Sequence, residues 1–244
     1  MTNQTTLIVG ANSEIAKALA EQVLTKNNQK LIVVSRNIEF YQQAQFNNVN
    51  VIPVASYQEQ EIQRTIEHIK QIETININQV YICHGVLHHQ NYQPEKRLED
   101  FSPEAFNQVI NANTVTPMLW LKHLVPLLTN KNDCKITVFS ARVGSISDNK
   151  LGGWYSYRAS KAAMNMLIKS AAVELARRAK NIKLISFHPG TTDTPLSKPF
   201  QKNVPQDKLF TCEFVALQLL NIVNEMPIDG EASFVDWQGK NITW

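Results

Sequence analysis

The stretch Leu7-Ile-Val-Gly-Ala-Asn-Ser-Glu-Ile-Ala16 decides the fold, because a short aliphatic run ends at a glycine and opens directly into a helix. The turn needs a residue without Cβ crowding, which Gly10 supplies. The helix that follows offers unpaired N–H groups at its N-terminus, where a pyrophosphate can bind. We therefore interpret this stretch as the first strand, turn and helix of an α/β fold.

Short aliphatic runs alternate with longer amphipathic stretches along the rest of the chain. This alternation is typical of a parallel sheet covered by helices on both faces. The expected strands are Thr5–Val9, Lys30–Val34, Val51–Val54, Gln79–Cys83, Lys135–Phe139, Lys183–Phe187 and Ser233–Val235. The expected helices are Ser13–Leu24, Glu59–Ile72, Pro103–Leu128, Gly153–Ala179 and Glu213–Asn224. A chain of 244 residues is most simply interpreted as one domain, residues 1–244.

The charge balance and the cysteines restrict the class of protein. The net charge of +3 is small and the basic residues are dispersed along the sequence, so neither nucleic acid nor an anionic membrane is expected as a partner. The start of the chain lacks the basic segment of a signal peptide, and no apolar stretch approaches the roughly 20 residues of a membrane span. The chain has three cysteines, Cys83, Cys134 and Cys212, an odd number without metal-type pairing. We interpret them as free thiols of a cytoplasmic protein. The His88-His89 pair has no further ligand at metal spacing, so no metal is expected.

The turn after the first expected strand is the candidate dinucleotide site. Gly10 alone remains of a full glycine-rich fingerprint, because Glu14 stands at the second glycine position and Ala16 at the third. A methyl group fits a helix–strand contact, whereas the Glu14 carboxylate is less favourable near a diphosphate, although its side chain could point outward to water. This segment by itself leaves cofactor binding open. The expected cofactor contacts here are Gly10, Asn12, Ser13, Glu14 and Ile15.

The end of the second expected strand distinguishes between two nicotinamide cofactors. An acidic residue there would bind a ribose 2′-hydroxyl and repel a 2′-phosphate. Ser35 occupies this point and Arg36 follows, with a guanidinium suited to bidentate phosphate contact. The alternative is a solvated arginine on a loop. The residue types favour NADP(H) over NAD(H).

The segment Trp154-Tyr-Ser-Tyr-Arg-Ala-Ser-Lys161 places a tyrosine four residues before a lysine. On a helix, Tyr157 and Lys161 would share one face. A nearby cation stabilises phenolate and should lower the pKa of the phenol from about 10 toward neutral pH. A proton donor of this kind suits carbonyl reduction, in which hydride at carbon is matched by a proton at oxygen.

Five segments, one of which extends the Trp154–Lys161 stretch, form a pattern that covers most of the chain. They are Gly85-Val-Leu-His88, Pro94-Glu-Lys-Arg-Leu-Glu99, Arg142-Val-Gly-Ser-Ile-Ser-Asp148, Gly152-Gly-Trp-Tyr-Ser-Tyr-Arg-Ala-Ser-Lys161 and His188-Pro-Gly-Thr-Thr-Asp-Thr194. The sequence resembles the short-chain dehydrogenase/reductase family and, more narrowly, its C-factor-like branch. The resemblance implies a Rossmann-type, doubly wound three-layer α/β/α sandwich of about seven mostly parallel strands. It also implies a nicotinamide cofactor and reversible alcohol/carbonyl chemistry.

The resemblance also implies roles for individual residues. Tyr157 matches the general acid/base, and Lys161 matches the lysine that tunes this phenol and holds the nicotinamide ribose. Asn113 matches an asparagine that holds a water on the proton path; a helix-interior Asn bonded to a backbone carbonyl is compatible with this role. The remaining implied cofactor contacts are Gly85, Pro189, Gly190, Thr191, Thr192 and Thr194.

The sequence departs from the family pattern at three places. Only the glycine of the family's Asn-Asn-Ala-Gly remains in Ile82-Cys-His-Gly85, and Ala55-Ser-Tyr57 lacks the acidic residue that meets the adenine. In the third departure, the register set by Gly144 places Ala141 at the catalytic serine, and a methyl group donates no hydrogen bond. Ser140 should point to the other side of the strand, whereas Ser145 is the candidate replacement hydroxyl in the substrate pocket.

The resulting hypothesis is an NADPH-dependent reductase of an aldehyde, ketone or quinone. Substrate would enter over the loop 145–151 and under a mobile flap at Leu196–Lys208, and Trp154 would line either the pocket or a core or interface. The alternative is a catalytically weak or silent cofactor-binding signalling protein of C-factor type, favoured by Ala141 and Glu14. A structural scaffold is a third, weaker alternative. By analogy, a homodimer or homotetramer would form through the two long helices.

Overall fold

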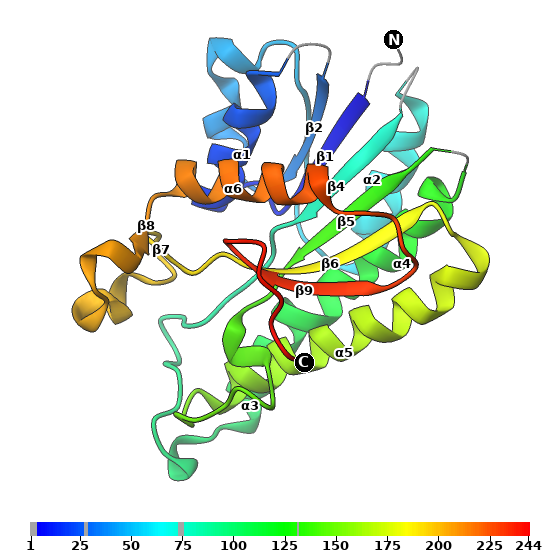
Figure 1. Cartoon of the computed structure of the whole chain (residues 1–244). Helices are drawn as coiled ribbons and strands as arrows, with labels where there is room; N and C mark the ends of the chain where they lie inside the picture. The colour runs from blue at the N-terminus through cyan, green and yellow to red at the C-terminus, as the bar shows by residue number, and fades with distance from the viewer. Residues whose placement is uncertain (1–3, 27–28, 73–75, 131) are drawn as a thin grey trace.

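The computed structural model describes residues 4–26, 29–72, 76–130 and 132–244 (Figure 1). Residues 1–3, which belong to the start expected to carry no signal peptide, lie outside the described residues. Seven parallel strands form one sheet in the order β3-β2-β1-β4-β5-β6-β9. The strands are β1 (Gln4–Val9), β2 (Gln29–Ser35), β3 (Asn50–Pro53), β4 (Ile77–Ile82), β5 (Cys134–Phe139), β6 (Ile182–His188) and β9 (Ala232–Asp236).

Helices cover both faces of this sheet, which confirms the Rossmann-type three-layer architecture (Figure 1). Alternate residues of β1 explain the layers, because Leu7 and Val9 pack on one face and Ile8 packs on the other. The first face is covered by α2 (Glu59–Gln71), α4 (Thr116–Leu128) and α5 (Tyr155–Arg178). The second face is covered by α1 (Glu14–Leu24) and α6 (Cys212–Glu225).

Two expected helices differ from the observed ones. The helix expected at Pro103–Leu128 consists of α3 (Pro103–Ile110) and α4, joined by a π-helical turn at Asn111–Val115. The helix expected from Gly153 begins at Tyr155, because Gly152, Gly153 and Trp154 have positive φ angles of 64°, 62° and 53°. Left-handed backbone cannot continue a right-handed helix.

A small lobe contains the segment Leu196–Lys208, which we expect to be a flap over the site. The short strands β7 (Thr191–Thr192) and β8 (Leu209–Phe210) pair with each other, and neither was predicted. Between them lie two 3₁₀ turns, Lys198–Asn203 and Gln206–Lys208. The expected flap therefore contains regular turns and lies between β7 and β8 in the sequence.

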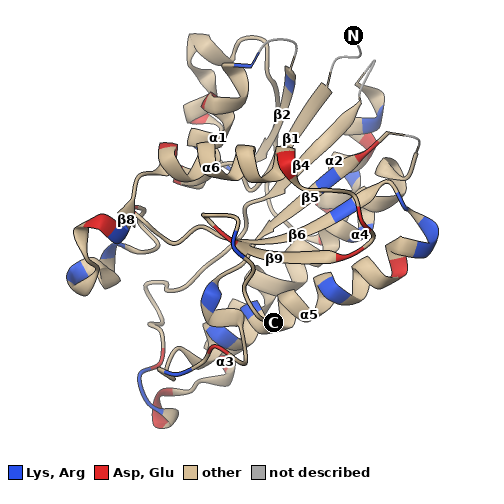
Figure 2. Cartoon of the chain, in the orientation of Figure 1, with Lys and Arg blue, Asp and Glu red and all other residues tan. Residues whose placement is uncertain are grey.

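The charged residues are distributed over several helices and loops (Figure 2). Cys83, Cys134 and Cys212 are buried free thiols, as predicted. Within the part of the chain that the structure describes, no helix has the length and apolar character needed to cross a membrane.

Candidate active site

A cavity of about 680 Å³ lies at the carboxyl ends of β1, β4, β5 and β6. The strand order reverses between β1 and β4, and ligands of open parallel sheets bind at such a reversal. Most of the residues singled out from the sequence line this cavity. They are Asn12, Ser13, Glu14, Ile15, Gly85, Trp154, Tyr157, Lys161, Pro189, Gly190, Thr191, Thr192 and Thr194.

The N-terminus of α1 forms one end of the cavity. Gly10 has a φ of 73°, and a Cβ there would lie 3.0 Å from Nδ1 of His84. The Ser13 hydroxyl caps the helix by accepting from the N–H of Ala16 at 3.3 Å. In the first turn, the N–H groups of Glu14 and Ile15 have no intrahelical acceptor.

The Glu14 side chain is directed toward Lys17, which lies three residues further along α1. Its carboxylate accepts from Lys17 Nζ at 2.8 Å, and the side chain is 44 % exposed. An anion at the helix N-terminus would therefore meet N–H groups and the positive end of the helix dipole. The tight turn, these free donors and the size of the cavity fit the diphosphate of a dinucleotide.

Ser35 and Arg36 lie beside the cavity and are not among the residues that line it. The buried Ser35 hydroxyl donates to the Asn37 carbonyl at 2.5 Å and accepts from the Asn37 N–H at 3.2 Å, so it shapes the turn after β2. The exposed Arg36 guanidinium stands 5.1 Å from the centroid of the Tyr57 ring. This stacking fixes a cation at the end of β2, where no acidic residue occurs.

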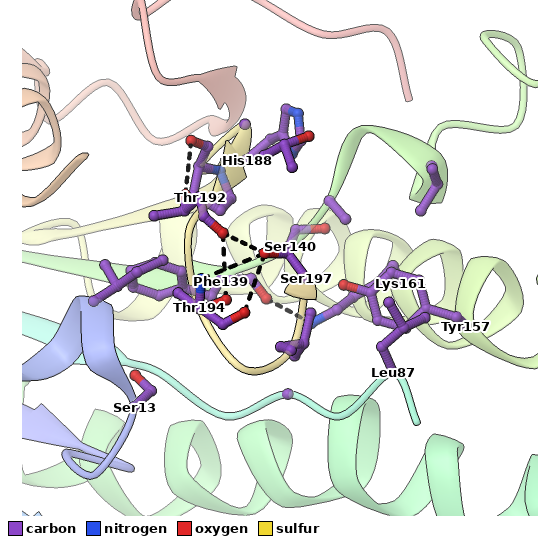
Figure 3. Close-up of a pocket in the computed structure, with 18 of the residues that line it drawn as sticks. Ser13, Leu87, Phe139, Ser140, Tyr157, Lys161, His188, Thr192, Thr194 and Ser197 are labelled. Carbon is purple, nitrogen blue, oxygen red and sulfur yellow. Dashed lines mark hydrogen bonds between the residues drawn. The ribbon is translucent and has the colours of Figure 1, made fainter. Parts of the chain in front are cut away.

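Tyr157 and Lys161 lie side by side on the first turns of α5 (Figure 3). Both side chains are buried, and Lys161 Nζ lies 5.8 Å from the centroid of the Tyr157 ring. The ammonium also donates to the Phe139 carbonyl at 2.8 Å, at the end of β5. The helical spacing thus brings the phenol and the amine together at the second end of the cavity.

The pKa of Tyr157 moves in the opposite direction to the one we expected. Burial raises the pKa of the phenol, because the charged phenolate is the form that loses most solvation. The same burial lowers the pKa of Lys161 to about 8. The expectation of an acidic phenol is therefore wrong, because burial is the cause that shifts the pKa of Tyr157.

Asn113 lies behind the cavity and joins three elements of the site. Its amide donates to the Val86 carbonyl at 2.8 Å and its oxygen accepts from the Val86 N–H at 2.7 Å. The amide also donates to the Ser160 hydroxyl at 3.0 Å, on α5. Asn113 stands in the π-helical turn, a feature found frequently at functional sites. It thereby positions the loop after β4, including Gly85, against the helix that carries Lys161.

Ala141 and Ser140, at and beside the position of the missing serine, have different surroundings. The Ala141 methyl group packs against Tyr157 and Leu87 and lines the cavity, as the register set by Gly144 predicts. The Ser140 hydroxyl donates to Asn165 Oδ1 at 2.7 Å and is thereby directed toward α5.

Ser145 is not where the replacement hydroxyl was expected. Its oxygen accepts from the Asp148 N–H at 3.2 Å and lies 3.4 Å from the Thr243 hydroxyl, outside the residues that line the cavity. Because a 3₁₀ turn at Arg142–Gly144 redirects the chain, Ser145 faces the C-terminal segment.

Two histidines that line the cavity, the buried His84 and the half-buried His188, were not predicted as site residues. Burial lowers the pKa of His84 to about 3 and that of His188 to about 4. His84 Nε2 and His188 Nδ1 have no hydrogen-bond partner among the described residues. The signals were available, since His84 stands in the altered Ile82–Gly85 segment and His188 precedes Pro189 and Gly190.

Residues 4–205 match the family model described as short chain dehydrogenase. The chain is 25 % identical over 240 residues to 1-hydroxy-2-glutathionyl-2-methyl-3-butene dehydrogenase of Rhodococcus sp. (strain AD45), covering 98 % of this chain and 99 % of that protein. It is 25 % identical over 218 residues to a Bacillus cereus benzil reductase ((S)-benzoin forming), covering 87 % and 85 %. It is 26 % identical over 145 residues to the C-signal of Myxococcus xanthus, covering 59 % and 81 %.

Solved structures share the fold. Carbonyl reductase Sniffer of D. melanogaster superimposes with a TM-score of 0.84 at 20 % identity, covering all of both chains. The NADPH-bound carbonyl reductase from chicken fatty liver gives a TM-score of 0.81 at 18 % identity, again over all of both chains. With the family model matching most of the sequence and seven parallel strands in one sheet, the chain belongs to the short-chain dehydrogenase/reductase family.

Proposed function

We propose that the protein reduces a carbonyl group of an aldehyde, ketone or quinone to an alcohol, with NADP(H) favoured over NAD(H). The observation that carries this proposal is the buried Tyr157–Lys161 pair at one end of a cavity whose other end is the N-terminus of α1. The alcohol/carbonyl activities named for the Rhodococcus and Bacillus cereus relatives support it.

The chain's own groups would hold the cofactor along the cavity. The turn at Gly10 and the first turn of α1 would bind the diphosphate, and the segment after β6 would bind the nicotinamide end. The residues in these two groups are Gly10, Asn12, Ser13, Glu14, Ile15, Pro189, Gly190, Thr191, Thr192 and Thr194. When bound, the nicotinamide supplies the hydride that reduces the carbonyl carbon.

Tyr157 would donate the proton that completes the reduction. Its O–H bond breaks as the new O–H bond forms on the substrate oxygen, leaving a phenolate. Burial, by raising the pKa of Tyr157, keeps the phenol protonated before transfer, and the Lys161 ammonium stabilises the phenolate after it. Asn113 would position Lys161 through Ser160 and hold the loop that carries Gly85.

Arg36 supports the choice of NADP(H). Its guanidinium is held over Tyr57 at the strand end where an acidic residue would select NAD(H). A 2′-phosphate there would meet a positive, planar donor group.

A catalytically weak or silent cofactor-binding signalling protein is the second candidate function. The Ala141 methyl group at the serine position favours it, since loss of one donor to a reacting oxygen costs roughly 3 kcal/mol in the transition state. Similarity to the C-signal adds support. Against it stands the presence of Tyr157, Lys161 and Asn113 together, because a protein freed from catalysis has no need of all three.

NADPH consumption by the purified protein against a panel of aldehydes, ketones and quinones tests the choice. We expect NADPH fluorescence titration to detect binding, and at least one panel member to be reduced with turnover. Tight NADPH binding without any turnover would favour the signalling function, and no binding of NADPH or NADH would contradict both.

The quaternary structure would follow from α4 and α5. Met166 and Val173 on α5 are 65 % and 54 % exposed, so apolar surface is available on this helix for a second copy. We expect light scattering to detect a homodimer or homotetramer, and a monomer at micromolar concentration would contradict this part of the proposal.

A further inference from the structure

The wall around Tyr157 has a consistent chemical character. Tyr157, Leu87 and Ala141 form a small apolar cluster, and four half-buried side chains pack against it. We call the set around Tyr157 the apolar enclosure; it consists of Leu87, Ala141, Val143, Trp154, Leu196 and Phe200. All six residues line the cavity.

Aromatic rings form the mouth of the apolar enclosure. The Trp154 ring lies 6.2 Å from the Tyr157 ring and 5.0 Å from the Phe200 ring, with interplanar angles of 76° and 61°. Phe200 comes from the 3₁₀ turn of the flap, which is tied down where His88 Nε2 approaches the Leu196 carbonyl at 3.2 Å. The Trp154 and Phe200 rings therefore line the space next to the Tyr157 phenol. Aromatic side chains in this arrangement favour packing against the flat ring of a substrate.

The charged groups near this mouth are already engaged. The Arg142 guanidinium donates to Asp236 at 2.9 Å and to Asp148 at 3.4 Å. Lys161 Nζ donates to the Phe139 carbonyl. A carboxylate or phosphate on the substrate would lose its hydration inside the apolar enclosure, and Arg142 already has two carboxylate partners, so the penalty for such burial is large.

From these contacts we infer that the substrate is an uncharged aryl carbonyl compound, whose ring packs against the Trp154 and Phe200 rings while its carbonyl oxygen faces Tyr157. This inference rests on the proposed function and specifies its substrate class. Because Ala141 contributes no donor, the reacting carbon has to be electrophilic through its own substituents. Electron-poor aryl aldehydes and ketones meet both conditions.

A pair of substrates that differ only in charge tests the inference. Methyl 4-formylbenzoate and 4-carboxybenzaldehyde share the ring and the reacting group, and the first is neutral. We expect kcat/KM with NADPH to be at least 30-fold higher for the ester than for the acid, and higher than for cyclohexanecarbaldehyde, which lacks the aromatic ring. Equal turnover of the ester and the acid would overturn the inference.

Variants and a binding measurement separate this inference from the proposed function. We expect Phe200→Ala to raise the KM for the ester at least tenfold, while NADPH binding stays unchanged. The control Phe101→Ala removes an exposed ring outside the cavity and should leave all kinetic parameters unchanged.

Saturation-transfer NMR should detect binding of the ester, and not of the acid, to the protein. If no carbonyl is reduced but this binding preference holds, the proposed function fails and the inferred ligand class stands; binding of the acid as strong as that of the ester contradicts it.

A second, independent observation concerns the start of α5. The helices α1, α3 and α6 are each capped by their own hydroxyl residue, whereas Trp154, at the same position of α5, provides no side-chain cap. The cap comes from Glu95, 61 residues away in sequence: both of its carboxylate oxygens accept from the Ser156 N–H, at 3.2 and 3.1 Å, and one also accepts from the Ser156 hydroxyl.

Glu95 fixes the helix through its backbone as well. Its carbonyl accepts from the Trp154 N–H at 2.5 Å, and a Cβ on Gly153 would lie 3.3 Å from the same oxygen. Glu95 is 5 % exposed. Ser156, whose N–H it caps, directly precedes Tyr157. A buried carboxylate at a helix N-terminus is stabilised by the helix dipole and by the N–H groups that it accepts from.

We propose that Glu95 is a positioning residue, which sets the place of the Tyr157 phenol by anchoring the first turn of α5. Removal of the cap should let this turn fray and displace the proton donor, whereas an amide keeps an acceptor at the same place. Ser102, which caps α3 by accepting from Ala105 at 3.3 Å, provides a matched control on a helix without a site residue.

Hydrogen exchange and kinetics test the role of Glu95 together. We expect Glu95→Ala to increase amide exchange across residues 155–158 at least tenfold and to lower kcat more than tenfold with less than threefold change in the KM for NADPH. Glu95→Gln should recover most of both effects. Ser102→Ala should lower the melting temperature by a few degrees with kcat unchanged. Unchanged exchange at the start of α5 in Glu95→Ala would overturn the proposal, whether or not a turnover assay exists.

Discussion

The two ends of the cavity are built from different parts of the chain. At the α1 end, the useful groups are the left-handed turn at Gly10 and the N–H groups of the first helical turn, while the Glu14 side chain points away to Lys17. At the α5 end, the useful groups are the buried side chains of Tyr157 and Lys161. A site made of backbone tolerates substitutions, whereas a site made of side chains does not.

This difference explains why the two ends depart so unequally from the family pattern. Two of the three fingerprint glycines are replaced at the α1 end, and the helix N-terminus is still formed. At the α5 end the single replacement of a hydroxyl by the Ala141 methyl removes a donor outright. Predictions that alter one end at a time can break or sharpen this comparison.

The largest effect should follow a change at the α5 end. Lys161→Met removes the ammonium that stabilises the phenolate and should lower kcat at least 100-fold. In the wild type, the lowered pKa of Lys161, about 8, means that the ammonium is present below this pH and lost above it. The kcat for reduction should therefore fall as the pH rises through about 8. A kcat–pH profile that stays flat to pH 9.5 would contradict the assigned role.

An effect on stability should arise from His84, which packs between the two ends. Its pKa of about 3 in the folded protein lies below its value of 6.5 in the unfolded chain, so the unfolded state binds more protons between these values. The free energy of unfolding should fall by about 2 kcal/mol between pH 7.5 and pH 5 because of this group.

Urea denaturation at both pH values measures the His84 contribution. The variant His84→Phe keeps a ring against Trp120, with which His84 stacks at 6.4 Å, and cannot bind a proton. Its loss of stability on acidification should be smaller than that of the wild type by the same amount. An identical loss in both proteins would show that His84 does not titrate in this range.

At the α1 end, the selectivity between NADPH and NADH should depend more on the charge of residue 36 than on the shape of its side chain. Arg36→Asp places a carboxylate at the end of β2 and should shift the ratio of NADPH to NADH affinity at least tenfold toward NADH. Arg36→Lys keeps the positive charge without the planar fork and should shift it less. Fluorescence titration with the two cofactors measures the ratio, and unchanged selectivity in Arg36→Asp would argue against a 2′-phosphate contact.

The smallest effect should follow Ala141→Ser. The position already faces Tyr157 and Leu87, so a hydroxyl there would reach the reacting oxygen and should preserve kcat or raise it a few-fold. A collapse of kcat would indicate that the end of β5 differs from the family geometry. Ser145→Ala should leave kcat unchanged, because the Ser145 hydroxyl bonds within its own loop.

The fold and most of the cavity could be predicted from local patterns. Aliphatic runs and a glycine turn fix strands and helix starts, and the four-residue step from Tyr157 to Lys161 fixes their shared face. The start of α5 was predicted two residues too early, because three consecutive residues before the helix have positive φ angles. Two of them are glycines, whose positive φ angles a sequence pattern does not reveal.

Other features depend on contacts that no local pattern contains. The raised pKa of Tyr157 reflects burial by Leu87 and Trp154, residues from two different loops. The Ser145 hydroxyl also lies 3.4 Å from the hydroxyl of Thr243, 98 residues away in sequence. The cap that Glu95 provides to α5 likewise joins distant segments.

The most direct test of the central claim compares Tyr157→Phe with the wild type. We predict that the variant binds NADPH with unchanged affinity by fluorescence titration and loses at least 1,000-fold in kcat with any carbonyl that the wild type reduces, because a phenyl ring carries no proton to donate. Full activity of Tyr157→Phe with such a substrate would contradict the account.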